Sequence, residues 1–364
     1  MSEAIGSLFL TPTGGLTPAS FLLLIGLPLL FSGKIIWGTT IALIGLLSAL
    51  RQAMQEIKEA EKQEIRYSIF SPEDILAELE MLEETKDQID TEKARTQCLA
   101  SLAALARKYC KETEDDVPLF CQQAAYLSLR LYLEDDDIVA GAISILALVA
   151  KKTQVRQRNK NQANIYGLDR PIQALKKALE RAKKEEDQAK EELLAEIQRK
   201  GALFLGALAD GDKEFDLPIK IVEEDGLELI LDAANWFRLH EYVANWALWA
   251  IFIICYEQSR NKVQFVRLSG ITTVCELMKH HPDSLEVNRH GVAILFDLLK
   301  EGNETEGVKW DPWEVRRLAL GAGLHKVVLN AMTEFSDSMD IMMMGQEMLI
   351  GTGYRGEIPM PQHL

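Results

Sequence analysis

Cysteine is scarce in this sequence, and no two cysteines have the spacing of a metal-binding or redox pair. The five residues stand singly in apolar stretches of helical periodicity, with no CxxC pair, at Cys98, Cys110, Cys121, Cys255 and Cys275. This pattern is typical of reduced thiols in helix cores, and it provides neither a disulfide framework nor a zinc-binding spacing. We therefore expect the folded body to lie on a reducing side, in cytosol, matrix or stroma.

Catalytic signatures are missing as well. The sequence has no HExxH, no GxSxG, no phosphate-binding loop and no kinase motif. Residues 351–356 match the spacing GxGxxG, but they follow a Met-rich helical stretch instead of a strand, so we interpret them as a helix C-cap. His280 and His281 stand in a turn with nothing beside them to complete a metal site. The sequence predicts no enzyme, no cofactor and no metal.

Basic residues are outnumbered, since 40 Lys and Arg stand against 55 Asp and Glu, for a net charge of −15. Such a surface argues against DNA binding by the whole body. Residues 151–184, the basic segment, reverse this balance, and their candidate binding residues include Arg156, Arg158, Lys160, Lys176 and Lys177. The segment is either a docking surface for an acidic partner, anionic lipid or RNA, or a solvated insertion that the acidic body attracts.

Long apolar runs are confined to one place, residues 19–50, where Lys34 is the single charge. A continuous helix of this length would reach about 48 Å, which exceeds a hydrocarbon core of roughly 30 Å. Pro28 and residues 32–34 indicate a break. We expect a membrane segment, residues 18–53, made of one span over residues 35–53 or of a short hairpin; burial in a protein partner is the alternative. The cations that begin at Arg51 place the body on the reducing side. A mitochondrion or plastid fits this arrangement.

A glycine-led phrase recurs in the C-terminal half. It reads IVEEDGLELIL at 221–231, RLSGITTVCELM at 267–278 and LGAGLHKVVLNAM at 320–332, which aligns Gly226, Gly270 and Gly323. A second apolar helix follows each copy and carries a small residue, and a similar helix precedes the first copy; these positions are Gly201, Ala244, Gly291 and Gly345. Helical repeats with a period of roughly 40–47 residues are typical of HEAT or armadillo α-solenoids. Small residues at these positions would permit sharp turns and close helix contacts.

These phrases resemble the armadillo-repeat family. "EEDGLELIL", "RLSGI" and "GAGLHKVV" are similar to its glycine-led helix entry, and "HHPDSLEVNRHGVAILFDLL" is similar to its acidic turn and next repeat. The resemblance covers residues 186–356 best and implies an all-α, armadillo-like solenoid. The family's import receptors carry Trp followed four residues later by Asn, whereas Trp246 is followed by Ala250. An import-receptor role is therefore not expected.

Tryptophans gather in one part of these repeats. Trp246 and Trp249 share a helix face, which is typical of a core, yet residues 234–254 are apolar around most of the helix. A partner groove that includes these two indoles is the alternative to a core role.

The order of segments follows from these patterns, and no stretch has a convincing strand pattern. We expect a tail (1–17), the membrane segment (18–53), a connecting helix (54–70), helical repeats (71–152), a basic insertion (153–185) and armadillo-like repeats (186–364). Residues 153–170 are expected to be a loop and residues 171–200 one long helix. The function expected is a membrane-tethered, non-catalytic scaffold that binds proteins. A structural subunit of a large membrane complex is the alternative, and an enzyme ranks third.

Overall fold

The computed structural model describes residues 77, 79–81, 91–109, 119–151, 156–212, 214–300 and 311–360. Contacts divide the chain into two units, Met1–Phe70 and Ser71–Leu364, and all described residues belong to the second. Within those residues every regular element is a helix, so the described part is all-α. The expected membrane segment and connecting helix lie outside the described residues. Across the ranges given, no helix has both the length and the apolarity needed to cross a bilayer.

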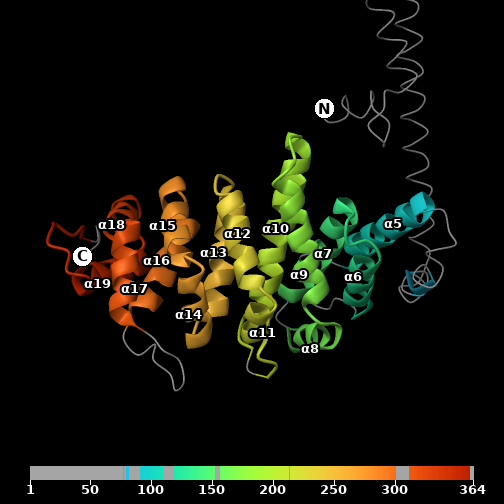
Figure 1. The fold of residues 1–364 in the computed structure, drawn as a ribbon, viewed down its shortest axis with the longest axis horizontal. Coiled ribbons are helices and arrows are strands. Elements are labelled where there is room, and N and C mark those ends of the chain that lie inside the picture. Colours follow the sequence, from blue (N-terminus) through green and yellow to red (C-terminus); the bar gives the residue numbers. More distant parts are fainter. Residues whose placement is uncertain are drawn as a thin grey trace, which may run out of the picture. The chain divides into compact units, whose positions relative to one another are not determined.

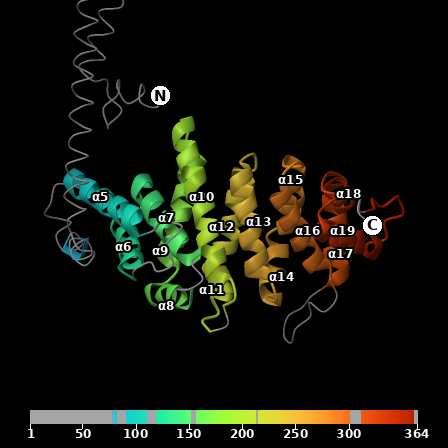
Figure 2. The ribbon, with the colours of Figure 1, turned by 180° about the vertical axis from the view of Figure 1, so that it is seen from behind.

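Most of the described helices of the second unit belong to two layers that keep sequence order (Figures 1 and 2). The first layer consists of α6 (Leu119–Leu131), α9 (Asp169–Ala182), α12 (Gly226–Trp236), α15 (Gly270–His280) and α18 (Leu324–Glu334). The second layer consists of α7 (Asp136–Lys151), α10 (Gln188–Ala209), α13 (Glu241–Cys255), α16 (Leu285–Leu299) and α19 (Met339–Gly351). Each helix contacts the next one in its own layer, an arrangement consistent with an α-solenoid.

Short helices precede four of the layer pairs. They are α8 (Arg156–Tyr166), α11 (Leu217–Glu223), α14 (Ser259–Arg267) and α17 (Pro312–Ala322). The described helices from α8 onward thus form four units of three helices, each a short helix followed by one helix from each layer. Before them, α5 (Thr91–Tyr109) packs on α6 and α7. The repeat is therefore a three-helix unit, and it begins earlier in the chain than the glycine phrases indicate.

A left-handed residue stands between the short helix and the first-layer helix in all four units. These residues have φ values between 61° and 94°, and they are Gly167, Asp225, Ser269 and Gly323. Positive φ reverses the chain direction over one residue, which lets two helices meet at a tight corner. The last three corners are separated by 44 and then 54 residues. The longer period contains residues 301–310, which lie outside the description.

The alignment of Gly226, Gly270 and Gly323 was wrong by one residue in the third copy. Gly226 and Gly270 are the first residues of α12 and α15, whereas Gly323 is itself the left-handed corner before α18. The counterpart of Gly270 is therefore Leu324. The glycines have two different roles. At Gly226 and Gly270 a side chain would clash with a neighbouring residue, whereas Gly323 adopts a φ of 94°.

The space at Gly270 is taken by an aromatic ring. A Cβ atom on Gly270 would lie 2.2 Å from Cε2 of Phe265, and one on Gly226 would lie 2.8 Å from Ile221, the residue in the same position of α11. In the third copy the sizes are exchanged, because Ala319 stands where Phe265 does and buried Leu324 replaces the glycine. Large and small residues thus complement each other at one contact of the repeat.

The glycines of the second layer are equivalent in two copies. A Cβ atom on Gly291 would meet Sδ of Met278 at 2.6 Å, and one on Gly345 would meet Sδ of Met332 at 2.7 Å. The counterpart of Gly291 in α13 is Ala247, not Ala244, because the offset between these units is 44 residues. Gly201 on α10 makes room for Leu175 of α9, whose Cδ2 would lie 2.3 Å from an added Cβ.

Two secondary-structure predictions near the basic segment were wrong. Residues 153–170 were expected to be a loop, but Arg156–Tyr166 form α8. Residues 171–200 were expected to be one helix, but α9 ends at Ala182 and α10 begins at Gln188. Asp187 caps α10, since its carboxylate accepts from the backbone N–H of Ala189 at 2.9 Å. The basic insertion is therefore the first two helices of a repeat.

Candidate functional site

One face of α13 carries a row of aromatic and apolar side chains that its neighbours do not fully cover. The members follow helical spacing, and we call them the α13 stripe: Tyr242, Trp246, Trp249, Ile253 and Tyr256. Tyr242 is 71% exposed and Tyr256 is 49% exposed, while the three residues between them are half-buried. Most of the other residues of α13 are buried, including Ala247, Leu248 and Ile251. The stripe is thus an apolar surface at the middle of the second layer.

Trp249 rests on α10. Gly206 has no side chain, and a Cβ atom there would lie 2.5 Å from Cζ3 of the Trp249 indole. Trp246 packs edge to face against Trp249, with ring centroids 5.5 Å apart. The ammonium of Lys151, at the end of α7, lies 5.9 Å from the centroid of the Trp246 ring. Side chains of α7 and α13 therefore meet across α10, whose residues 201–209 are buried.

The α16 side of the stripe includes a polar contact between uncharged side chains. Asn245 lies beside Trp246 and forms a hydrogen bond of 3.1 Å with Nδ1 of His290 on α16. Burial lowers the pKa of His290 from its ordinary value, and Arg289 acts in the same direction while Glu286 opposes it. The imidazole therefore stays neutral at pH 7. A ligand on the stripe would meet aromatic rings, the ammonium of Lys151 beside Trp246, and the hydrogen-bonded pair Asn245–His290.

Trp246 and Trp249 are both half-buried. Each indole packs against a neighbouring ring or helix, and each keeps part of its surface in solvent. Tyr242 and Tyr256 belong to the same surface, and the sequence prediction missed them. Their spacing of four residues before Trp246 and seven after Trp249 was the available signal.

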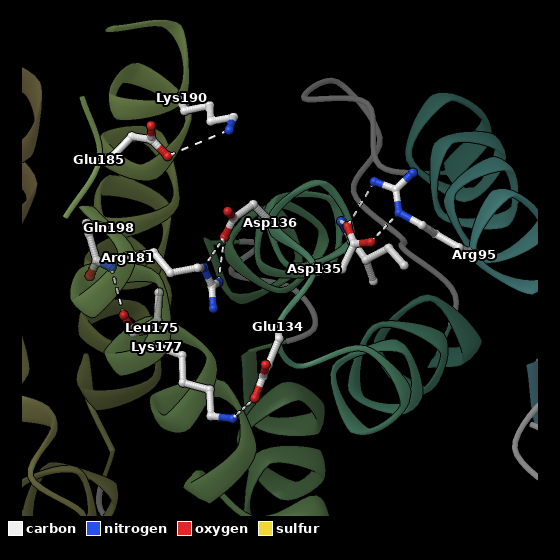
Figure 3. A network of polar contacts seen from close by, with 11 residues as sticks. Arg95, Glu134, Asp135, Asp136, Leu175, Lys177, Arg181, Glu185, Lys190 and Gln198 are labelled. Carbon is white, nitrogen blue, oxygen red and sulfur yellow. Dashed lines mark hydrogen bonds and ion pairs between the residues drawn. The ribbon is translucent and has the colours of Figure 1, made fainter. Parts of the chain in front are cut away.

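The basic segment is largely paired within the fold. Lys177 of α9 forms an ion pair with Glu134, and Nε of Arg181 donates to Asp136 at 2.8 Å (Figure 3). On the other side of α9, Nζ of Lys176 donates to Asp225 at 2.8 Å. The hydrogen bond from Lys177 also lowers the pKa of the Glu134 carboxyl below its ordinary value. These contacts join α9 to the units before and after it, which supports the interpretation that the acidic body attracts the basic residues.

Lys160 is not a surface cation, in contrast to its assignment as a candidate binding residue. Its side chain is 1% exposed, and Nζ donates to the carbonyl of Asp210 at 2.7 Å and lies 3.8 Å from Oδ1 of Asp212, which is also buried. Lys262, seven residues before Ser269 as Lys160 is before Gly167, is buried too and pairs with Asp297 at 2.7 Å. The side chains of Arg156 and Arg158 lie outside the described residues.

The remaining candidates pack or terminate helices. Cys98, Cys121, Cys255 and Cys275 are buried free thiols, and burial raises the pKa of Cys255 and of Cys275 to about 12. Gly351 ends α19, and Gly353 follows with a φ of 79°, which confirms the helix C-cap predicted for residues 351–356. Among the residues that the structure describes, no group of His, Cys, Asp and Glu could hold a metal ion.

Comparison with known proteins adds no relative. No family model matches the chain, no curated protein matches it, and no solved structure matches it. The site is therefore interpreted from its own chemistry.

Proposed function

We propose that this protein is a non-catalytic scaffold, an armadillo-like α-solenoid that binds a protein segment on the α13 stripe. The observation that carries the proposal is the partly exposed row of aromatic and apolar side chains in the second layer, from Tyr242 to Tyr256. Three-helix units, two of whose corners are 44 residues apart, support the armadillo resemblance of residues 186–356.

Aromatic side chains at such a surface are suited to protein recognition. Tyrosine and tryptophan offer a large contact area with few rotatable bonds, and they are enriched among residues that dominate binding energy. Trp246 and Trp249 are already held in place by each other and by Gly206, so little side-chain entropy is lost when a ligand binds. The segment expected here is apolar and carries an acidic residue near Lys151.

A membrane tether is the second part of the proposal, and it rests on the sequence alone. Residues 19–50 contain a single charge, and cations begin at Arg51. A tethered scaffold would hold its partner near the membrane surface. The alternative remains a structural subunit of a membrane complex, and the two differ in migration on a blue native gel after mild detergent extraction, because an obligate subunit would migrate only in a large complex.

Binding can be tested with a phage-displayed library of random peptides, selected on the full chain in detergent. We expect enriched peptides with clustered apolar residues and an acidic residue. Trp246→Ala should weaken their binding at least about tenfold, because an anchor residue contributes more than 1–2 kcal/mol. The matched control is Trp236→Ala, since this indole is 45% exposed but belongs to α12. Equal binding by the wild-type chain and Trp246→Ala would refute the proposed site.

A further inference from the structure

The short first helix of a unit carries a cation at the same position in three of the four units. Lys160, Lys262 and Arg316 each lie seven residues before the left-handed corner of their unit. The two lysines are buried, and each faces a carboxylate. Nζ of Lys262 lies 2.7 Å from Oδ2 of Asp297 on α16. Nζ of Lys160 lies 3.8 Å from Oδ1 of Asp212, after the end of α10. In these two units the cation belongs to an ion pair with a carboxylate of the same unit.

The carboxylate is missing in the unit that contains Arg316. With the offset of 54 residues between the last two corners, Arg316 corresponds to Lys262 and Gly351 corresponds to Asp297. Gly351 has no side chain, and a Cβ atom added to it would meet nothing within 4 Å. Within the described residues Arg316 forms no ion pair with a carboxylate, and its guanidinium carbon lies 5.3 Å from the centroid of the exposed Trp313 ring. The last unit thus keeps the cation and lacks the anion.

The unit formed by α11, α12 and α13 shows that the two positions belong together. With the offset of 44 residues, the counterparts of Lys262 and Asp297 in that unit are Pro218 and Ile253. Both charges are absent there, whereas both are present in the next unit. A cation without its carboxylate is therefore particular to the last unit.

A cavity occupies the place of the missing side chain. Its volume is about 360 Å³, and Arg316 and Gly351 both line it, as their correspondence to Lys262 and Asp297 requires. The rest of the wall comes from the ends of α16 and α19, with the residues Phe296, Leu299, Lys300, Glu347, Met348 and Thr352. Small-molecule sites in proteins have volumes of roughly 300–1,000 Å³ and are mostly apolar with a few polar groups. We call this space the Arg316 cavity.

The wall of the Arg316 cavity fits a ligand that has one carboxylate and an apolar body. A carboxylate is the group that Asp297 supplies in the preceding unit, and a guanidinium can donate two parallel N–H bonds to it. Phenylalanine, leucine and methionine side chains provide the apolar contact. Glu347 also lines the cavity, and the carbonyls at the end of α19 carry negative partial charge, so a ligand with a second negative charge is disfavoured.

From these relationships we infer that the Arg316 cavity binds a small organic acid, whose carboxylate pairs with Arg316 in the place that the Asp297 side chain takes in the preceding unit. The site shares no residue with the α13 stripe, so it is independent of the protein-binding function proposed above.

Isothermal titration calorimetry of the full chain in an uncharged detergent tests this inference, with cinnamate as the probe. We expect the wild-type chain to bind cinnamate, and to bind the neutral amide of this acid at least about tenfold more weakly, because the amide cannot pair with a guanidinium. Arg316→Gln should weaken cinnamate binding at least about tenfold. Arg317→Gln is the control, since this neighbouring side chain is exposed and pairs with Glu314. No binding by the wild-type chain, or equal affinities of the wild type and Arg316→Gln, would overturn the inference.

A second pair of variants separates charge from space at Gly351. Gly351→Asp restores the carboxylate of the preceding unit within the chain, so it should compete with the ligand for Arg316. Gly351→Asn adds a side chain of the same size without the charge. Both variants should fold, because an added Cβ atom meets no neighbour, and their melting curves check this. Gly351→Asp should weaken cinnamate binding at least about tenfold more than Gly351→Asn does. Equal losses would mean that the cavity does not recognise a carboxylate, which would overturn the inference.

Discussion

The indole of Trp249 lies so close to Gly206 that a single methyl group on the glycine would come within 2.5 Å of the ring. The same methyl group would lie 3.0 Å from the Cα atom of Ala250, so α10 and α13 are in close backbone contact. The Trp249 ring of the α13 stripe therefore occupies the space that a side chain at position 206 of α10 would need. Any residue larger than glycine must move the ring, the helix or both.

Gly206→Ala is expected to destabilise the fold by about 1–3 kcal/mol, because overpacking against a backbone atom cannot be relieved by a rotamer change alone. Thermal or urea unfolding measures this cost. The matched control is Gly321→Ala on α17, where an added Cβ atom meets nothing within 4 Å. That control should be neutral or slightly stabilising, since alanine favours helix by up to about 1 kcal/mol. Equal effects of the two substitutions would contradict the described packing.

Lys160→Met should lower stability by about 3 kcal/mol or more, since removal of the lysine leaves the buried carboxylate of Asp212 without its cation. Lys176→Met is the control, because its pair with Asp225 is exposed and worth about 0–1 kcal/mol. Chemical denaturation of both variants measures their free energies of unfolding and so distinguishes the two costs. If both substitutions cost the same small amount, Lys160 would have to be solvated and available to a partner.

Lys160 also shows why residues 153–170 were wrongly predicted to be a loop. Residues 156–166 are mostly polar, so apolar periodicity predicts no helix there. This helix is stabilised by contacts with residues that are distant in the sequence. One of them is the hydrogen bond from Lys160 to the carbonyl of Asp210, fifty residues later. Charge composition alone does not distinguish a buried cation from a docking surface.

The repeats were detectable because a glycine recurs within each phrase, but these glycines have two different structural roles. Asp225 and Ser269 occupy the left-handed corner without glycine, and Gly323 occupies it with glycine. A sequence alignment that joins the glycines is therefore displaced by one residue in the third copy. The all-helical class did not depend on that register, whereas only one interval between corners, 44 residues, falls within the predicted period of roughly 40–47 residues. The clustering of Trp246 and Trp249 is visible in the sequence. The exposure of Tyr242 could not be predicted from the sequence, because it depends on how the neighbouring helices pack around α13.

His290 should make stability depend on pH below neutrality. Burial lowers its folded pKa, so the unfolded chain, with a histidine pKa near about 6.5, takes up the proton first. The contribution is present above the unfolded pKa and is lost as pH falls toward the folded pKa. Melting temperatures from pH 8 to 5 should fall more steeply for the wild type than for His290→Gln. Parallel curves would show that Glu286, on the same helix, offsets the effect of burial.

Membrane association is expected of residues 19–50, because a stretch with one charge would expose a large apolar surface in water. Carbonate-washed membranes should retain the full chain, and a variant that lacks residues 1–53 should be released. Release of the full chain under the same wash would contradict the tether. Residues 303–305 match the Asn-X-Thr pattern of N-glycosylation, and their replacement should leave the gel mobility of the chain unchanged, because we expect the body to face a reducing compartment.

The exchange of sizes between Phe265–Gly270 and Ala319–Leu324 makes the alignment of the units testable. Gly270→Leu should destabilise by about 1–3 kcal/mol through overpacking against the Phe265 ring, and Phe265→Ala by about 3–5 kcal/mol through the space it leaves. The double variant recreates the pair found in the next unit. Its cost should be smaller than the sum of the single costs by about 1–3 kcal/mol, as residues in contact are coupled. Gly323→Leu paired with Phe265→Ala should show no such coupling, because Gly323 needs its φ of 94° and makes no contact with that ring. Additive costs for Gly270→Leu and Phe265→Ala would mean that Leu324 is not the counterpart of Gly270 and that the units are aligned differently.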